Sequence, residues 1–499
     1  VVLGAAARAL ALAPAGSGKT TAMEVLSRAW QDSGGTVLGL APTAAAAEVL
    51  RQDLAGATTD TVAKLVFMAT GPKHIAHRDK AALRWFNNIN ERTLIIVDET
   101  GLAGTLDIDT VMAVAKARGA QVRTIGDDRQ LNSISCGGVL RDVAHSAGSL
   151  TLTEIVRFKD PAEAAASLAL RKGDVSGIGY YLDRDRIHVG ADATASDMAY
   201  NAWKAERDAG NKSIMVAPTN DIVTELNARA RMDRLRESGQ PPGREVELAD
   251  GQRASAGDII CTRENARWLA MTGSDFVRNG YRWEVIRVRR NGSIKARHVE
   301  SGRMVDLPPD YIATNLTLGY ATTIDSAQGL TAYSCHIVGS IALTAQQLYV
   351  AITRGKLANH VYFSTAEADP HRVLTPRATH PQTAVDVLTD IVNRDGAQES
   401  AMTAERVAHD PFNRLGHAAD MYSDAAGSVA EHTLGKAIMT QIDEGADTLH
   451  PGLTAYDTWP ALRKRLAVLA FGTRSAATAM THLKAAIDQR DLDDADDVA

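Results

Sequence analysis

Cysteine is scarce in this sequence, and its placement offers no framework for disulfides. Cys136, Cys261 and Cys335 are the three cysteines in 499 residues, and they lie far apart in the chain. This spacing excludes a disulfide-rich scaffold and a paired-cysteine metal site. A few separated thiols are typical of a reducing compartment, so we expect a cytoplasmic protein.

Positive charge and long apolar runs are lacking as well. Lys and Arg number 54 against 60 Asp and Glu, which gives a formal net charge of −6. The balance excludes a chain that is basic throughout, although a local basic groove stays compatible with it. No apolar run has the length that crosses a bilayer, so no membrane insertion is expected. The chain opens on Val1 and not on Met, and we expect it to be a fragment of a longer protein.

A phosphate-binding loop is the first pattern that the sequence does contain. APAGSGKT, residues 13–20, fits such a loop except that Ala13 replaces the usual first Gly. An apolar stretch before it predicts a short buried strand, and TAMEVLSRAW after it predicts a helix. Lys19 is expected to reach the β- and γ-phosphates, and the Thr20 hydroxyl to bind Mg²⁺. The residues expected to hold the nucleotide are Ala15, Gly16, Ser17, Gly18, Lys19, Thr20 and Thr21.

Such a loop predicts a carboxylate on a neighbouring strand, and TLIIVDET, residues 93–100, supplies it. Its continuous apolar run is typical of a parallel strand covered on both faces. Asp98 is expected to hold Mg²⁺, and Glu99 to polarise the attacking water. After a third expected strand, in VRTIGDDRQL, Gln130 is expected to sense the γ-phosphate. Together these motifs predict a nucleoside-triphosphate hydrolase in which Lys19 is also catalytic.

Further motifs follow in a fixed order, from residue 10 to about residue 356. They read APAGSGKTT, LAPTAAAAEVL, LIIVDETG, GDDRQL, LTEIVRF, VAPTN, YATTIDSAQGLTA and QLYVAITRGK. This ordered set resembles motifs I to VI of the superfamily 1 DNA helicases, and the RecD-like branch in particular. LAPTAAAAEVL, RFKDPAEAAASLALRKGD and FNRLGHAADMYSDAAGSVAEH are also similar to the helicase region of TraI/TrwC-type conjugative relaxases of actinobacteria.

The resemblance implies roles for residues outside the phosphate loop. Arg157 in EIVRF and Arg354 in AITRG match the two arginines that reach the γ-phosphate from the second motor domain. Gln328 and Gly329 match the motif that links nucleotide to DNA. ATP and Mg²⁺ are implied as ligands, although the glutamine motif that reads adenine is absent. The positions that match contacts to the backbone of single-stranded DNA are Thr43, Thr61, Thr219 and Thr323.

Two positions depart from the RecD-like pattern. Where those proteins often carry His, this sequence has Ala63 in TDTVAKL and Asp325 in TIDSAQG. These departures concern contacts with DNA, and they leave the residues expected to hydrolyse ATP intact.

The expected fold class is α/β: two RecA-like phosphate-loop motor domains, a small SH3-like β-barrel insertion and a helical C-terminal tail. The barrel is indicated by alternating polar and apolar residues around the turns Asn279-Gly280 and Asn291-Gly292. The tail is alanine-rich and ends in acidic residues. The expected domains are the first motor domain at 1–150, the second at 151–237 and 313–365, the barrel at 238–312 and the tail at 366–499.

Two segments leave alternatives open. Residues 64–90 are basic with interleaved aromatics, which fits either an inserted subdomain that stacks on DNA or a packed connector. His74 and His77 lie three apart in that segment without further ligands, so no metal site is expected. Four arginines of the barrel either line a DNA path or form a solvated strand face: Arg282, Arg287, Arg289 and Arg290.

The resemblance implies an ATP-dependent helicase that translocates 5′ to 3′ on single-stranded DNA, as the helicase part of a conjugative plasmid-transfer relaxase. Single-stranded DNA is the expected partner, with other conjugation or secretion proteins as further partners. Nicking is not expected, because no tyrosine cluster with a three-histidine metal site occurs. Two alternatives stay open: a RecD-like repair or recombination helicase, and a degenerate motor that binds DNA or presents a secretion signal.

Overall fold

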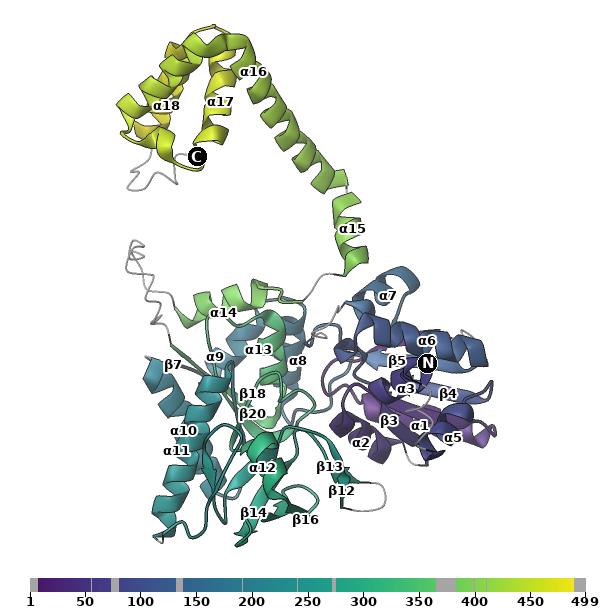
Figure 1. Ribbon diagram of the computed structural model, residues 1–499. Coiled ribbons are helices and arrows are strands. Elements are labelled where there is room, and N and C mark those ends of the chain that lie inside the picture. Colours follow the sequence, from purple (N-terminus) through teal and green to yellow (C-terminus); the bar gives the residue numbers. More distant parts are fainter. Residues whose placement is uncertain are drawn as a thin grey trace. The chain divides into compact units, whose positions relative to one another are not determined.

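Two compact units make up the computed structural model of this chain, Val1–Ser400 and Ala401–Ala499. The first unit contains the two motor domains and the barrel, and the second is helical (Figure 1). The structure describes residues 8–54, 56–72, 80–131, 138–190, 192–239, 241–271, 275–364, 383–397, 400–409 and 411–488.

A six-stranded parallel sheet forms the centre of the first motor domain, with the strand order β3-β2-β4-β5-β1-β6. Its strands are β1 (Arg8–Leu12), β2 (Thr36–Ala41), β3 (Thr58–Thr61), β4 (Thr93–Val97), β5 (Gln121–Gly126) and β6 (Leu150–Thr151). All residues of β4 are buried, as expected of a parallel strand covered on both faces. Because β5 lies between β1 and β4, the prediction that the carboxylate strand neighbours the phosphate-loop strand is wrong. The carboxyl ends of these parallel strands still meet at one edge of the sheet.

The helices of the first motor domain connect these strands. They are α1 (Lys19–Asp32), α2 (Ala44–Asp53), α3 (Val62–Thr70), α5 (Lys80–Asn87), α6 (Thr105–Arg118) and α7 (Val139–Ala147). Within the basic segment 64–90, Trp85 and Phe86 pack against the core of this domain. The Arg118 guanidinium lies 4.3 Å from the Phe86 ring centroid, which is a cation–π distance. Of the two alternatives for residues 64–90, the packed connector fits α3 and α5. His74 and His77 lie outside the described residues.

The second motor domain has a five-stranded parallel sheet with the order β18-β8-β19-β20-β7. Its strands are β7 (Ile187–Gly190), β8 (Ile214–Ala217), β18 (Ala321–Thr323), β19 (Ala332–Val338) and β20 (Gly355–Ser364). Its helices are α8 (Pro161–Arg171), α9 (Gly177–Asp183), α10 (Asp192–Asp208), α11 (Asn220–Ser238), α13 (Ala345–Ile352) and α14 (Ala384–Asn393). Val387, Leu388, Ile391 and Val392 of α14 are buried in the core of this domain. The separate helical unit therefore begins at Ala401 and not at the expected position 366.

The barrel lies between α11 and β18 in the chain and is built around an antiparallel sheet with the order β16-β15-β14-β11-β17. Its strands are β9 (Val246–Glu247), β10 (Arg253–Ala254), β11 (Ile259–Thr262), β12 (Ala266–Ala270), β13 (Phe276–Val277), β14 (Arg282–Val288), β15 (Ile294–His298), β16 (Met304–Leu307) and β17 (Leu316–Leu318), with α12 (Pro309–Asn315) before the last. Trp283 is fully buried in its core. Gly280 and Gly292, at the two predicted turns, take φ of +85° and +81°. The sheet continues through β17, so the barrel ends beyond the expected residue 312.

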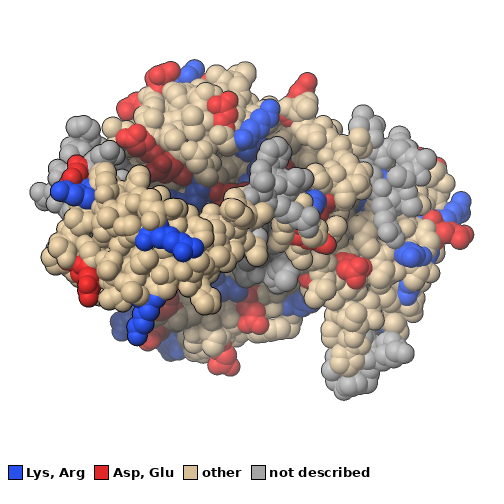
Figure 2. Space-filling model, turned by 90° about the horizontal axis from the view of Figure 1, so that it is seen from above, with Lys and Arg blue, Asp and Glu red and all other residues tan. Residues whose placement is uncertain are grey.

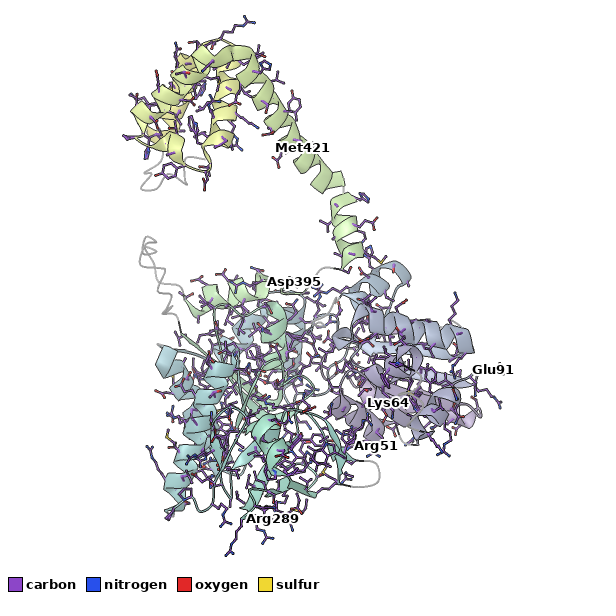
Figure 3. The ribbon with its side chains drawn as sticks, in the orientation of Figure 1. Arg51, Lys64, Glu91, Arg289, Asp395 and Met421 are labelled. Atoms are coloured by element: carbon purple, nitrogen blue, oxygen red, sulfur yellow. The ribbon has the colours of Figure 1, made fainter. Side chains whose placement is uncertain are left out.

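One hairpin of the barrel, β12–β13, contacts the first motor domain. Arg278 pairs with Glu48 of α2 at 2.8 Å, and both side chains are only 6% exposed. Arg267 pairs with Asp60 at 2.9 Å. Arg51, labelled in Figure 3, pairs with the same Glu48 from within α2. The second motor domain is thus attached to the first through the barrel as well as through the chain.

The helical unit consists of α15 (Ala401–His409), α16 (Pro411–Leu449), α17 (Trp459–Phe471) and α18 (Ala476–Asp488). A backbone break at Gly435, with φ of +76°, interrupts α16. The core of the unit is formed by the second half of α16 with α17 and α18, whereas Met421 in the first half is 61% exposed (Figure 3). No helix within the described ranges is long and apolar enough to cross a membrane.

Shortening the chain tests where the second motor domain ends. A chain that stops at residue 365 loses the four buried side chains of α14, each contributing roughly 1.5–3 kcal/mol when buried. Their sum is comparable with the stability of a whole domain, about 5–15 kcal/mol. We expect the chain 1–400 to unfold cooperatively and the chain 1–365 to be unfolded or much less stable, as measured by circular dichroism during heating. Equal unfolding midpoints would assign α14 to the tail instead.

Candidate active site

The phosphate loop runs from the end of β1 to the start of α1. Gly16 and Gly18 take φ of +79° and +74°, a region that glycine adopts at little cost. Gly18 is the N-cap of α1 and supplies no side chain to the first N–H groups of the helix, so they remain available to an anion. The buried Ser17 hydroxyl has no hydrogen-bond partner. An unsatisfied hydroxyl beside free helix N–H groups fits a bound phosphate.

Lys19 lies between the two predicted carboxylates. Its Nζ is 3.1 Å from Asp98 Oδ1 and also pairs with Glu99 Oε1. Burial lowers the pKa of Lys19, but the attraction of Asp98 and Glu99 outweighs it, and the pKa is raised. Burial raises the pKa of Asp98 above its ordinary value despite the Lys19 charge. Burial acts in the same direction on Glu99, but Lys19, with Arg354 and Arg157, holds the pKa of Glu99 below its ordinary value.

Thr20 is expected to bind Mg²⁺ and here lies beside a carboxylate that sequence reasoning missed. Its hydroxyl is 3.3 Å from Oδ2 of Asp53, near the end of α2. Burial raises the pKa of Asp53, with the Thr20 hydrogen bond and the Lys19 charge opposing the shift. Thr21 is exposed on α1. Oxygen ligands such as the Thr20 hydroxyl and the Asp98 carboxylate suit Mg²⁺, so the residues present fit this ion.

Asp127, at the end of β5, collects hydrogen bonds from both motor domains. Its Oδ2 accepts from the Ala15 N–H at 3.2 Å and from the Tyr349 hydroxyl at 3.0 Å. The Tyr349 hydroxyl in turn accepts from the Ala15 N–H at 3.0 Å. Arg171 Nη2 pairs with Asp127 Oδ1 at 2.8 Å, and Gln130 Nε2 lies 3.3 Å from Oδ2. We call Ala15, Asp127, Gln130, Arg171 and Tyr349 the Asp127 cluster.

The two predicted arginine fingers occupy different environments. Arg157 follows β6 and packs on the phosphate loop, since a Cβ on Gly16 would lie 2.3 Å from the Arg157 Cβ. Its Nη1 donates to the Thr353 carbonyl oxygen at 2.7 Å, in the second motor domain. Arg354 is 2% exposed and donates to the carbonyl of Val350 at 2.7 Å. Burial lowers the pKa of Arg354 to about 10, and the neighbouring Arg157 adds to this effect.

The motif V loop is connected to Arg354. The guanidinium Nη1 lies 3.4 Å from the Ala327 carbonyl oxygen and 3.3 Å from that of Leu330. Between them, Gly329 takes φ of +85°, and the buried Oε1 of Gln328 has no hydrogen-bond partner. Gln328 therefore retains an acceptor for a ligand or a neighbouring residue. The structure thus places Gln328 and Gly329 beside the helix end that carries Arg354.

Three of the four predicted DNA-contact threonines are helix N-caps. Thr43, Thr61 and Thr219 cap α2, α3 and α11, and each side chain accepts a hydrogen bond from an N–H of the first turn. Thr323 ends β18, and its hydroxyl lies 2.9 Å from that of Ser326. Thr43 and Thr219 follow the parallel strands β2 and β8, and Thr61 is the last residue of β3. Helix N-termini carry partial positive charge, which favours the phosphates of a DNA backbone.

Charged side chains of both signs are scattered over the face shown in Figure 2, without a continuous basic field. In the barrel, Arg289 pairs with Asp306 at 2.7 Å and lies at the end of β14 (Figure 3). Of the two alternatives for the barrel arginines, a DNA path or a solvated strand face, the second fits Arg289. For Arg282, Arg287 and Arg290 both alternatives stay predictions. Within the described ranges, no group of three or more His, Cys, Asp or Glu side chains is arranged to hold a metal ion.

Sequence reasoning assigned no role to Asp53, Asp127, Arg171 or Tyr349. Tyr349 carries a hydroxyl inside the apolar run of QLYVAITRG, and this was the one feature of the sequence that could have indicated a role for it. Arg171 and Asp127 belong to different domains and are 44 residues apart, so no local pattern relates them.

The comparisons with known proteins cover most of this first unit. A family model described as AAA domain matches residues 2–192. A second, described as Rv2311 SH3-like barrel domain, matches residues 246–317, which is the barrel as the structure places it.

Curated proteins with similar sequences come from several bacteria. A probable conjugal transfer protein TraA of Sinorhizobium fredii is 28% identical over 369 residues, which are 72% of this chain and 31% of that protein. The ATP-dependent RecD2 DNA helicase of Deinococcus radiodurans is 25% identical over 385 residues, 72% of this chain and 47% of that protein. The protein Rv2311 of Mycobacterium tuberculosis is 37% identical over 125 residues, 24% of this chain and 68% of that protein. The chain spans about a third of the length of the TraA proteins that it matches.

Among solved structures, the Pif1 helicase from Bacteroides in complex with ADP-AlF3 and single-stranded DNA is similar, with a TM-score of 0.49. It is 18% identical, and the match covers 81% of this chain and 94% of that one. The family itself follows from the ordered motifs, the two domain matches and the sequence relatives. This chain belongs to the RecD-like superfamily 1 helicases related to conjugative relaxases, and its barrel is of the Rv2311 SH3-like type.

Proposed function

We propose that this chain is an ATP- and Mg²⁺-dependent helicase that translocates 5′ to 3′ on single-stranded DNA, within a protein of conjugative plasmid transfer. The observation that carries the proposal is the meeting of Lys19, Asp98 and Glu99 of the first motor domain with Arg157 at the phosphate loop. Arg157 in turn donates to the second motor domain. The TraA relatives, matched over 72% of this chain, support the conjugative setting.

Each residue has a part in hydrolysis. Lys19 and the loop N–H groups beyond Ala15 would bind and orient the phosphates, and Thr20 with Asp98 would hold Mg²⁺, which would neutralise charge on the phosphates. Glu99 accepts a proton from the attacking water. Arg157 lies at the phosphate loop, and Arg354 approaches the γ-phosphate when the two motor domains close, so hydrolysis depends on closure.

The Lys19 pairing gives Glu99 a way to change its basicity. With Lys19 on it, Glu99 is held ionised and its pKa lies below the ordinary value. When Lys19 turns to the phosphates, one of the causes that lower the pKa of Glu99 is removed.

Translocation requires contacts with DNA on both motor domains. Thr43 and Thr61 lie on the first domain and Thr219 and Thr323 on the second. Opening and closing of the nucleotide cleft changes the separation of these two sets, which moves the chain along a bound strand. A RecD-like repair or recombination helicase is the second candidate, since a RecD2 DNA helicase is among the relatives, and a degenerate motor is the third.

Replacing Glu99 with Gln tests its role as general base. The amide keeps the shape of the side chain but accepts no proton, so Glu99→Gln is expected to bind ATP and to hydrolyse it at least ~10²-fold more slowly. Glu91→Gln is the control, because Glu91 is exposed in the same domain (Figure 3). Steady-state phosphate release measures the effect. Turnover of Glu99→Gln equal to that of the control would remove Glu99 from the mechanism.

Arg354→Ala tests the coupling of the two domains. We expect it to abolish unwinding and most DNA-stimulated hydrolysis while single-stranded DNA binding stays largely intact. Arg236→Ala is the control, since the Arg236 side chain is 76% exposed in the same domain. Because Arg354 also donates to several carbonyls, thermal unfolding is measured in parallel. Normal hydrolysis with a lowered unfolding midpoint would assign Arg354 a structural role only.

Polarity is tested by strand displacement on duplexes with a 5′ or a 3′ single-stranded tail, with ATP and Mg²⁺. We expect unwinding with the 5′ tail alone. Binding should weaken with added salt, because phosphate contacts release counterions, and should depend little on base sequence. Preference for the 3′ tail would contradict the RecD-like direction. Absence of unwinding on both substrates, with normal ATP binding, would favour the degenerate motor.

A further inference from the structure

The Asp127 cluster joins the two motor domains directly at the phosphate loop. Ala15 and Asp127 belong to the first domain, whereas Tyr349 on α13 and Arg171 on α8 belong to the second. Asp127 and Tyr349 are 4% and 2% exposed. Hydrogen bonds in such a buried place are stronger than at a surface, and losing one partner leaves a buried polar group unpaired.

A second contact holds the same helix. Gln346 Nε2, on the first turn of α13, donates to Asp395 Oδ1 at 2.5 Å, and Arg141 of α7 pairs with Asp395 Oδ2 at 3.1 Å (Figure 3). Gln346 and Tyr349 are three residues apart, so they lie on one face of α13. This face of α13 is therefore fixed against the first motor domain at two points.

The position of α13 determines where Arg354 lies. Arg354 follows the end of α13 by two residues, and its Nε donates back to the Val350 carbonyl of that helix. The Thr353 carbonyl, beside it, accepts from Arg157. A helix of this length moves as a rigid body, so a contact at Tyr349 places both arginine-bearing segments relative to the phosphate loop.

We propose that Tyr349 is a positioning residue that stabilises the closed arrangement of the two motor domains by bridging the Ala15 N–H and the Asp127 carboxylate. A contact between two domains favours only the state in which it forms. The proposal rests on the proposed function in one respect, namely that closure of the two motor domains brings Arg354 to the γ-phosphate. Tyr349 itself touches no reacting atom.

Tyrosine suits this position because its hydroxyl donates and accepts at once. It accepts from the Ala15 N–H and donates to Asp127 Oδ2, each at 3.0 Å. Arg171 supplies the positive charge that a buried Asp127 requires, with its Nη2 also 2.5 Å from Asp128 Oδ1. An uncharged hydroxyl beside the loop adds no charge where phosphates bind.

Tyr349→Phe is the test, because it keeps the ring and removes the hydroxyl. Affinity for ADP and for a non-hydrolysable ATP analogue is measured without DNA, and kcat and KM for ATP are measured with it. We expect unchanged ADP affinity, because ADP lacks the phosphate that the second domain reaches. Analogue affinity and kcat are expected to fall about 2- to 13-fold, the factor that one ordinary intramolecular hydrogen bond gives.

Tyr181→Phe is the matched control. Tyr181 is fully buried in α9 of the same domain, and its hydroxyl has no hydrogen-bond partner, so its removal should change none of these quantities. Arg171→Lys is a second variant that keeps the charge but cannot pair with Asp127 and Asp128 at once. Like Tyr349→Phe, Arg171→Lys is expected to lower the affinity for the ATP analogue and to leave the affinity for ADP unchanged.

Two results would overturn the role of Tyr349: equal losses for ADP and the analogue, or no loss for either in both variants. The binding experiment does not depend on DNA. If DNA does not stimulate ATP hydrolysis by the wild-type chain, the proposed function is contradicted. The difference in affinity between ADP and the analogue would still decide the role of Tyr349.

Discussion

A single ammonium shared by two carboxylates is the constraint on which the site depends. Lys19 begins α1, while Asp98 and Glu99 follow β4, two strands away in the sheet. All three side chains are largely shielded from water, so separating the ammonium from the carboxylates is unfavourable unless other charges replace it. The parallel sheet achieves this because all its strands end at one edge.

The second motor domain adds contacts to that edge. Arg171 and Tyr349 reach Asp127, and Arg157 reaches across to the second domain through the Thr353 carbonyl. The strand ends of the first domain thus serve two purposes. Those of β1 and β4 carry the residues proposed to bind and hydrolyse the nucleotide, and that of β5 carries contacts to the second domain.

The sequence predicted those parts of the site that local patterns encode. The loop glycines and the carboxylates after an apolar strand each follow from a few neighbouring residues. Strand order does not, and β5 between β1 and β4 was missed for that reason. The threonines were expected to contact DNA, which stays a prediction, and the structure shows three of them as helix caps. Asp127 and Tyr349 are 222 residues apart, so their contact depends on how the two domains meet. A helical tail was expected from residue 366, but the packing of α14 on the second motor domain depends on contacts between distant residues, which no local pattern encodes.

The barrel hairpin has a mechanical consequence. It fastens the second motor domain to the first at Glu48 of α2 and Asp60 of β3, which are not part of the Asp127 cluster. The two motor domains are therefore joined both at the phosphate loop and through the barrel hairpin, so a relative movement that breaks one set of contacts leaves the other to hold the domains together.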